Sequence, residues 1–161
     1  MDARAVVLNE LRRHRQVAAE SVVILRSELR HGRQLVAVEC DSRQAPPARM
    51  RCLFAFDAAA PSEAEGSYIG VAGASLHRST VWSNYGQFTA GEFEVMGGWT
   101  VAGAAEVELV DSTDRKIRER VESGVVMFGE LRDSFGPVIR ATLRDESGDV
   151  LGQEAFPSDG P

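Results

Sequence analysis

Long hydrophobic runs and cysteine are both scarce in this sequence, and each absence excludes a class of protein. No apolar run in the 161 residues approaches the ~18 residues that a transmembrane helix needs. The first 20 residues lack a continuous apolar core followed by a small-residue cleavage site, so we expect no secretory signal. The two cysteines, Cys40 and Cys52, are too few for a disulfide-dense secreted scaffold. We therefore expect a cytoplasmic protein with no membrane contact.

Lysine is nearly absent, because 17 of the 18 basic residues are Arg and only Lys116 is Lys. With the many Ala and Gly residues, this composition indicates high-GC coding and a bacterial source. The net charge of −6 argues against a dedicated nucleic-acid binder. Residues 1–51 carry a net charge of +4 and residues 52–161 a net charge of −10. Either the basic cluster around Arg12, Arg13 and Arg15 binds an acidic partner, or two faces of one domain differ in charge.

Recognisable catalytic and cofactor motifs are also missing. The sequence has no P-loop, no Gly-x-Gly-x-x-Gly after a strand and no Gly-x-Ser-x-Gly element. Residues 145–149 superficially resemble a calcium loop, but the required Gly and Glu positions hold Val150 and Phe156. Two cysteines without a second pair of ligands do not make a zinc site. We therefore expect no metal and no cofactor.

The histidines show no metal-ligand spacing either. They are His14, His31 and His77, and solvated or capping roles suit them better than metal binding. Ser75 lies two residues before His77, which leaves a Ser–His catalytic site as a weaker alternative.

Residues 3–19 have the pattern of a helix, with Asp2 as the N-cap and Val7, Leu11 and Ala18 near helical spacing. From residue 21 onward the period changes to that of strands. We therefore expect an N-terminal helix within residues 1–20, a single β domain over residues 21–156 and a disordered tail at residues 157–161.

A hairpin is expected where two Val-rich alternating segments, residues 21–30 and 34–40, flank a His31-Gly32 turn. This turn sets Arg30 opposite Arg33, Leu25 opposite Val38 and Val23 opposite Cys40. The register places one apolar set on a common face: Val23, Leu25, Val36, Val38 and Cys40.

The next strand, residues 50–56, alternates so that Met50, Cys52, Phe54 and Phe56 share a face. If it pairs with the preceding strand, Cys52 lies near Cys40. Two outcomes remain open for the pair, a disulfide or two reduced thiols that act as small hydrophobic residues.

The C-terminal third predicts a regular series of strands at residues 104–110, 116–121, 125–131, 138–144 and 150–154. A three-residue loop sets Glu108 opposite Arg118 and Glu106 opposite Arg120, and opposite charges across strands stabilise a pair. With the earlier segments this makes about ten short strands at roughly 8–12-residue spacing, which is typical of a sandwich or a barrel.

Residues 66–93 are the least decided stretch, and their end is rich in aromatic side chains. We expect strands at residues 68–71, 80–82 and 92–100, with Gly97-Gly98 as a bend or bulge. Aromatic residues among glycines line ligand pockets and partner surfaces, but they also fill sandwich cores. The candidate binding residues are Trp82, Tyr85, Phe88 and Trp99.

From Glu94 to Glu154 the chain resembles an immunoglobulin-type β-sandwich. The segments that carry the resemblance are residues 104–111, 117–121, 125–128 and 137–145 with the Ser147-Gly148-Asp149 turn. The resemblance implies architecture only, because this fold supports many functions. We therefore expect a mainly β protein, an antiparallel immunoglobulin-like β-sandwich with an N-terminal α-helix. The alternative is a closed antiparallel β-barrel.

Two functional hypotheses follow. The first is a non-enzymatic intracellular module that binds a protein partner through a sheet edge or through residues 82–99. The second is a β-barrel that binds a small apolar ligand between Trp82, Tyr85, Phe88 and Trp99. A nucleic-acid partner for the basic helix is the least favoured alternative, and the oligomeric state stays open.

Overall fold

The computed structural model describes residues 2–13, 17–61, 63–72 and 79–156. His14, Ser75, His77 and the tail at 157–161 lie outside these ranges. The described residues form one helix and eleven strands: α1 (Ala3–Arg12), β1 (Val17–Arg30), β2 (Arg33–Ser42), β3 (Arg49–Asp57), β4 (Gly66–Val71), β5 (Trp82–Ala90), β6 (Phe93–Thr100), β7 (Glu106–Asp111), β8 (Lys116–Arg120), β9 (Val125–Leu131), β10 (Val138–Arg144) and β11 (Val150–Ala155). No helix in these ranges is long and apolar enough to cross a membrane.

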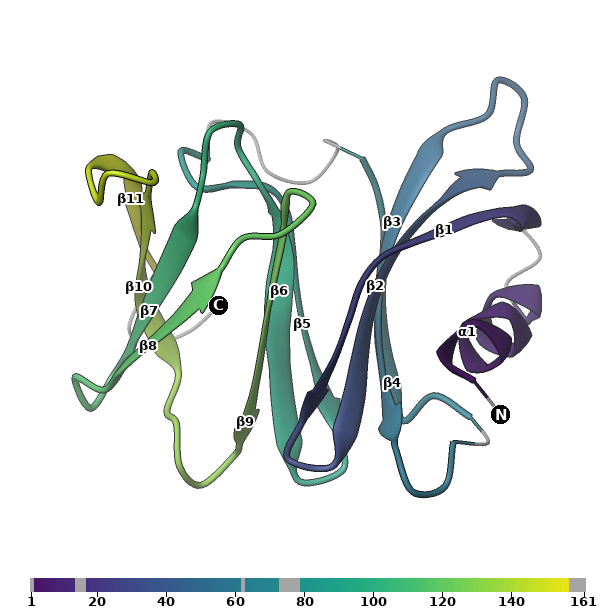
Figure 1. The fold of residues 1–161 in the computed structure, drawn as a ribbon, viewed down its shortest axis with the longest axis horizontal. Helices are drawn as coiled ribbons and strands as arrows, with labels where there is room; N and C mark the ends of the chain where they lie inside the picture. Colours follow the sequence, from purple (N-terminus) through teal and green to yellow (C-terminus); the bar gives the residue numbers. More distant parts are fainter. Residues whose placement is uncertain (1, 14–16, 62, 73–78, 157–161) are drawn as a thin grey trace.

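The strands form three antiparallel sheets. The first sheet has the order β1-β2-β3-β4, the second β5-β6-β9 and the third β11-β10-β7-β8. Figure 1 shows the three sheets stacked side by side, with the second sheet in the middle and α1 against the outer face of the first. The protein is therefore a stack of sandwiches that share their middle sheet.

Three apolar clusters fill the spaces between these layers. The cluster under α1 includes Val7, Leu11, Val38, Cys52 and Phe54. The cluster between the first and second sheets includes Leu35, Leu53, Val95, Trp99 and Met127. The cluster between the second and third sheets includes Trp82, Met96, Leu109, Phe128 and Leu143.

Strands with both faces covered carry nearly continuous hydrophobic runs instead of alternating patterns. In β6 and β9, for example, the stretches 95–99 and 125–129 are buried at every residue. The sandwich expectation is confirmed, and the alternative of a closed barrel does not hold because the described strands form separate sheets.

The helix is shorter than the sequence pattern predicted. Asp2 caps it as expected, because its Oδ1 accepts a hydrogen bond from the Ala5 amide at 2.8 Å. The helix ends at Arg12, however, and β1 already begins at Val17. Val17 and Val22 belong to the cluster under α1. Residues 17–19, which the sequence pattern assigns to the helix, therefore lie at the start of β1.

The β1–β2 turn is confirmed, and the predicted register holds from Arg30 opposite Arg33 to Arg26 opposite Ala37. Both turn residues have positive φ, +49° at His31 and +77° at Gly32, and Arg30 pairs with Arg33. An irregularity at Leu25 then shifts the pairing, so that Ile24, and not Leu25, lies opposite Val38. A bulge of this kind moves the following side chains to the other face.

The face assignments of the first hairpin change accordingly. Val36, Val38 and Cys40 do share the face under α1. Leu25 packs on the opposite face, against the second sheet, and Val23 is 48% exposed. The predicted partners Leu25–Val38 and Val23–Cys40 are therefore wrong.

Cys40 and Cys52 are free thiols buried beneath α1. They lie diagonally across β2 and β3, since Cys40 pairs with Met50 and Cys52 with Val38. A hydrogen bond shared with Cys40, together with burial, raises the pKa of the Cys52 thiol. A protonated buried thiol behaves as a small hydrophobic side chain, so the reduced alternative describes this pair.

The C-terminal strands follow the predicted register. Glu108 lies opposite Arg118, with Nε and Oε2 2.6 Å apart, and Glu106 lies opposite Arg120. The expected bulge at Gly97-Gly98 is wrong, because β6 pairs with β9 without a shift. The irregularity lies in the neighbouring β5, between Trp82 and Asn84. A Cβ at Gly98 would collide with the Asn84 carbonyl oxygen, so glycine admits the bulge of β5.

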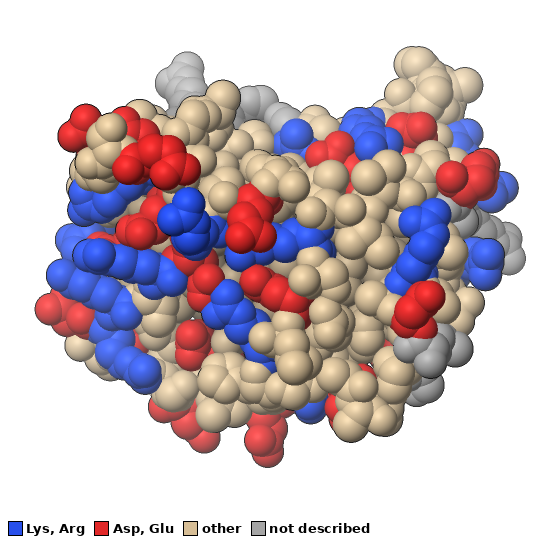
Figure 2. Space-filling model, in the orientation of Figure 1, with Lys and Arg blue, Asp and Glu red and all other residues tan. Residues whose placement is uncertain are grey.

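A set of charged side chains spans from β1 to β8 across the open edge of β9. The buried Arg26 guanidinium donates to the Arg120 carbonyl at 2.7 Å and to the Val125 carbonyl at 2.8 Å. Arg30 forms an ion pair with Glu119. Figure 2 shows basic and acidic side chains side by side on this front face. These groups occupy the edge of β9, where unpaired main-chain groups would otherwise recruit another strand.

Candidate binding site

The four candidate aromatic residues lie on opposite faces of the second sheet. Trp82 and Tyr85 face the third sheet, whereas Trp99 and Phe88 face the first sheet. Trp82 is 1% exposed and Trp99 is 3% exposed. The four side chains therefore do not line one common cavity.

Trp99 belongs to a polar network that joins the first and second sheets. Its Nε1 donates to Glu39 Oε1 at 3.2 Å, and the Arg51 guanidinium lies 5.5 Å from its ring centroid. Arg51 Nη1 also donates to Asn84 Oδ1 at 2.8 Å. Because Glu39 and Arg51 of the first sheet are hydrogen-bonded to Trp99 and Asn84 of the second, this network links the two sheets.

Trp82 and Tyr85 pack together in the other core, with ring centroids 4.9 Å apart. The Tyr85 hydroxyl reaches the surface and donates to Gln87 Oε1 at 3.3 Å. Burial, with the negative charge of Glu94 nearby, raises the pKa of the Tyr85 phenol. The phenol therefore stays protonated and acts as a hydrogen-bond donor at neutral pH.

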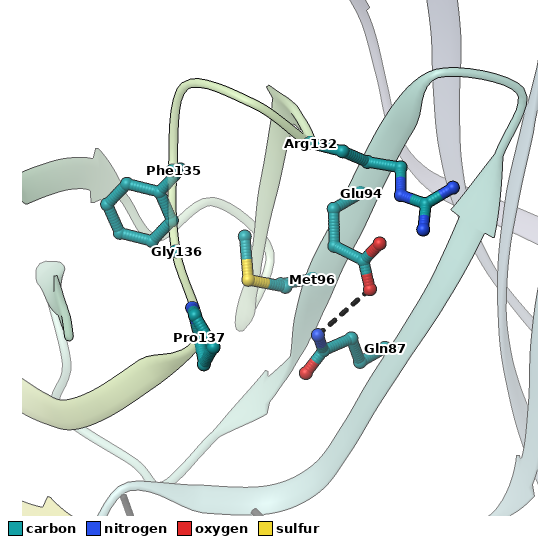
Figure 3. A pocket seen from close by; sticks show the side chains of 7 residues that line it. All are labelled: Gln87, Glu94, Met96, Arg132, Phe135, Gly136 and Pro137. Atoms are coloured by element: carbon teal, nitrogen blue, oxygen red, sulfur yellow. Dashed lines mark hydrogen bonds between the residues drawn. The ribbon is translucent and has the colours of Figure 1, made fainter. Parts of the chain in front are cut away.

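A cavity of about 240 Å³ opens beside these residues, at the end of the space between the second and third sheets. Its lining comes from β5, β6 and the connection between β9 and β10: Gln87, Glu94, Met96, Arg132, Phe135, Gly136 and Pro137. In Figure 3, Gln87 and Glu94 form one wall, Phe135 and Pro137 form the other, and Met96 lies between them. The cavity thus has a polar wall and an apolar wall.

The polar wall is held by a short chain of hydrogen bonds. Gln87 Nε2 donates to Glu94 Oε1 at 2.9 Å, and the Thr89 hydroxyl donates to Glu94 Oε2 at 3.3 Å. Tyr85 in turn holds the carbonyl oxygen of the Gln87 amide. The Glu94 carboxylate is therefore fixed in orientation, while each oxygen keeps a further lone pair for a ligand.

The apolar wall is anchored by Asp111, the last residue of β7. Its buried carboxylate accepts from the Gly136 amide at 2.8 Å and from the Thr113 and Arg115 amides at 2.9 Å and 2.8 Å. Burial disfavours the charged carboxylate, but these hydrogen bonds outweigh it and lower the pKa of Asp111. Asp111 thereby fixes the loop that carries Phe135 and Pro137.

A second cavity, of about 580 Å³, lies on the other side of Arg132. It is a more open depression lined by Gly91, Glu92, Leu131, Arg132, Asp133 and Ser134. Arg132 lines both cavities, so they are neighbours on the surface. We call the two cavities together the terminal groove.

Little in the sequence points to this groove, because residues 132–137 lie between two predicted strands and carry no recognised motif. The available signal was Phe135 before Gly136-Pro137, because a large aromatic residue in a short turn needs a core to pack against. Phe135 is indeed buried in the cluster between the second and third sheets.

The remaining chemistry-bearing residues that the structure describes do not gather into a site. His31 lies in the β1–β2 turn and stacks on Phe93 with ring centroids 5.9 Å apart. Within the described ranges, no group of three or more His, Cys, Asp or Glu side chains is placed to hold a metal ion.

Fold and site together define a mainly β protein of stacked antiparallel sheets with a groove at one end of the stack. Comparison with protein-family models, curated proteins and solved structures gave no match to this chain.

Proposed function

We propose that this chain is a non-enzymatic protein-interaction module and that the terminal groove receives a segment of its partner. The observation that carries the proposal is the groove itself, formed where the β5–β6 turn and the β9–β10 connection meet. Leu131 is 40% exposed and lines the larger cavity, whereas Phe135 and Pro137 line the smaller one. Exposed apolar residues in a depression rimmed by polar groups are typical of partner surfaces.

Cavity size favours a partner's side chain over a separate small molecule. The smaller cavity measures about 240 Å³, which is below the roughly 300–1,000 Å³ of small-molecule sites. The larger cavity is lined mainly by exposed residues, so it would leave a small ligand largely in water. A side chain that is anchored through the backbone of a partner protein suits these two depressions better than a small molecule does.

The two free thiols support placing this function in the cytoplasm. Cys40 and Cys52 are close enough to share a hydrogen bond but are not joined. Oxidising compartments favour disulfides, whereas the cytosol keeps thiols reduced.

Site-specific photo-crosslinking in cells of the source organism tests the proposal. The photoreactive amino acid p-benzoylphenylalanine replaces Leu131 in the groove, and in a matched chain it replaces Val150, which is 53% exposed on β11. We expect a discrete protein adduct only at position 131, lost when Ser134→Trp fills the groove and retained in Ser147→Trp. Purified partner and chain should then bind one to one. No adduct at position 131, or equal adducts at both positions, contradicts the proposal.

A further inference from the structure

The charges around the terminal groove are unbalanced in favour of acidic groups. Three acidic residues line the two cavities, Glu92, Glu94 and Asp133, against the single basic Arg132. No ion pair in the described part of the chain involves the Arg132 side chain. In Figure 3, Arg132 lies beyond Glu94, and its guanidinium is turned away from Met96. The space over Met96 therefore faces a carboxylate and not the arginine.

A second carboxylate reinforces this imbalance. Glu94 on β6 lies directly opposite Glu130 on β9. Both share a face with Met96 and Phe128, the face toward the third sheet, because residues two apart on a strand point the same way. Like charges directly opposite each other across two strands destabilise the pair. A positive charge placed between these carboxylates would remove that cost.

Among the residues that the structure describes, no arginine or lysine is ion-paired with Glu94. Several half-buried or buried glutamates elsewhere on the sheets have arginine partners: Glu39 pairs with Arg49, Glu108 with Arg118 and Glu119 with Arg30. Glu94 instead accepts from an amide and a hydroxyl, and no ion pair among the described residues involves Glu94 or Glu130. The Glu94 carboxylate is therefore oriented by neutral donors, which leave its negative charge unmatched.

The apolar wall restricts which cation fits. Met96, Phe135 and Pro137 form a surface opposite Glu94, and a thioether adapts its shape to a neighbouring alkyl chain. Arginine and lysine bury their alkyl stems on such surfaces while the charged head reaches a carboxylate. Arginine also presents a planar fork that matches a carboxylate with two hydrogen bonds.

We propose, on the basis of the interaction function above, that the terminal groove binds a basic extended segment of a partner protein. One arginine of this segment lies over Met96 with its guanidinium between Glu94 and Glu130. Acidic segments are repelled by the same carboxylates, which gives the groove its selectivity.

The test uses the full chain and two labelled nonapeptide libraries that differ only in a fixed central residue, Arg or Gln. Retention of the Arg library should exceed that of the Gln library by roughly tenfold, the equivalent of one charge-assisted hydrogen bond. In Glu94→Gln and Glu130→Gln the preference should fall several-fold. In Glu146→Gln, which makes the same charge change in the 145–149 turn, it should persist. Equal retention of the two libraries by the unmodified chain contradicts the inference.

Three further outcomes test this inference, and the first of them separates it from the proposed function. If the partner captured at position 131 binds Glu94→Gln and Glu130→Gln unchanged, the interaction function stands and the basic segment is wrong. If N-acetyl-arginine amide alone binds as tightly as the Arg library, the ligand is a free cation, and a protein segment is wrong. In the unliganded chain, Glu130→Gln should raise the melting temperature, and an unchanged or lower value removes the like-charge argument.

Discussion

The Asp111 side chain positions the loop that forms one wall of the groove. It is fully buried, and its carboxylate accepts four hydrogen bonds that join the end of β7 to the loop of Gly136 and Pro137. The sequence places it only beside a turn, Ser112-Thr113-Asp114. Its role depends on Gly136, which is 25 residues away in the chain, so local sequence rules could identify the turn but not the long-range bond.

We predict that Asp111→Asn destabilises the protein by about 1–3 kcal/mol, the cost of leaving one buried donor unsatisfied. The amide can still accept at one atom, but its nitrogen cannot accept from Gly136. Chemical denaturation at neutral pH measures the loss. The control is Asp114→Asn, an exposed position in the same turn, which should change stability little. Equal effects of the two substitutions contradict this role.

The stabilisation by Asp111 should also depend on pH in a defined direction. Its pKa in the folded protein lies below the ordinary value of 3.8. The stabilisation is therefore complete above pH 3.8 and is lost as the pH falls through the lowered value. The stability difference between the natural chain and Asp111→Asn should narrow below pH 3.8 and stay constant above it. A difference that grows on acidification contradicts the assignment.

Arg26 has the corresponding role between β1 and the strands β8 and β9. Its side chain is 6% exposed and donates to two carbonyl groups and to Glu28. We predict that Arg26→Met costs about 1–3 kcal/mol, because it leaves the carbonyl groups of Arg120 and Val125 without their donor, while Glu28 keeps its ion pair with Arg30. The control is Arg120→Met, whose pair with Glu146 is exposed at both residues, so its cost stays within about 1 kcal/mol. Comparable losses measured by thermal melting would argue against the bridging role.

At the scale of elements, α1 is the cover of the first sheet. Val6, Val7 and Leu11 are fully buried against the face that carries Cys40 and Cys52. We predict that neither thiol of the intact chain reacts with a thiol reagent such as dithionitrobenzoate under native conditions, because burial blocks access to both, and the hydrogen bond with Cys40, together with burial, raises the pKa of Cys52. Deleting residues 1–13 should make both thiols react.

The helix surface provides the control for that experiment. Arg12 is exposed, so Arg12→Ala should leave the thiols protected, whereas Leu11→Asp should expose them as the deletion does. Rapid labelling of the intact chain contradicts the covering role of α1. Protection that survives the deletion contradicts it equally.

The elements that sequence rules predicted well are those governed by local chemistry. The His31-Gly32 turn and the ladder of Glu106 and Glu108 against Arg120 and Arg118 follow from turn length and charge, and the structure has both. The hairpin register failed at Leu25 because a bulge depends on what packs on both faces of a strand. The bulge predicted at Gly97-Gly98 failed for a similar reason, because the irregularity for which these glycines leave room lies in the neighbouring strand β5.

For the whole molecule, the stacking of three sheets was not predictable from the alternating pattern alone. An alternating strand identifies one buried face, and it does not say which of several sheets covers that face. The same limitation applies to the aromatic residues, because Trp82 and Trp99 belong to one sheet but to two different cores. The groove lies where the ends of the second and third sheets meet, so it depends on a stacking that the alternating pattern does not encode.

Chain order also ties the layers to one another. The strand β9 belongs to the second sheet, although it lies in the chain between β8 and β10 of the third. Neither sheet can therefore form from a contiguous piece of chain. The first sheet is contiguous in sequence, but its inner face packs on β6 and β9, whose other face supports the third sheet. Loss of the middle sheet removes both cores at once.

We therefore predict that the two cores unfold together, and the two tryptophans provide a separate reporter for each. In Trp99→Phe the remaining Trp82 reports on the core beside the third sheet, and in Trp82→Phe the remaining Trp99 reports on the core beside the first. In each variant, tryptophan fluorescence and far-ultraviolet circular dichroism should give the same denaturant midpoint, as expected of a cooperative transition. The midpoints of the two variants can differ from each other, because Phe in place of Trp99 loses the hydrogen bond to Glu39. A Trp99 transition that precedes the loss of circular dichroism would show that the first sheet separates from the other two, and the stack would then be two units instead of one.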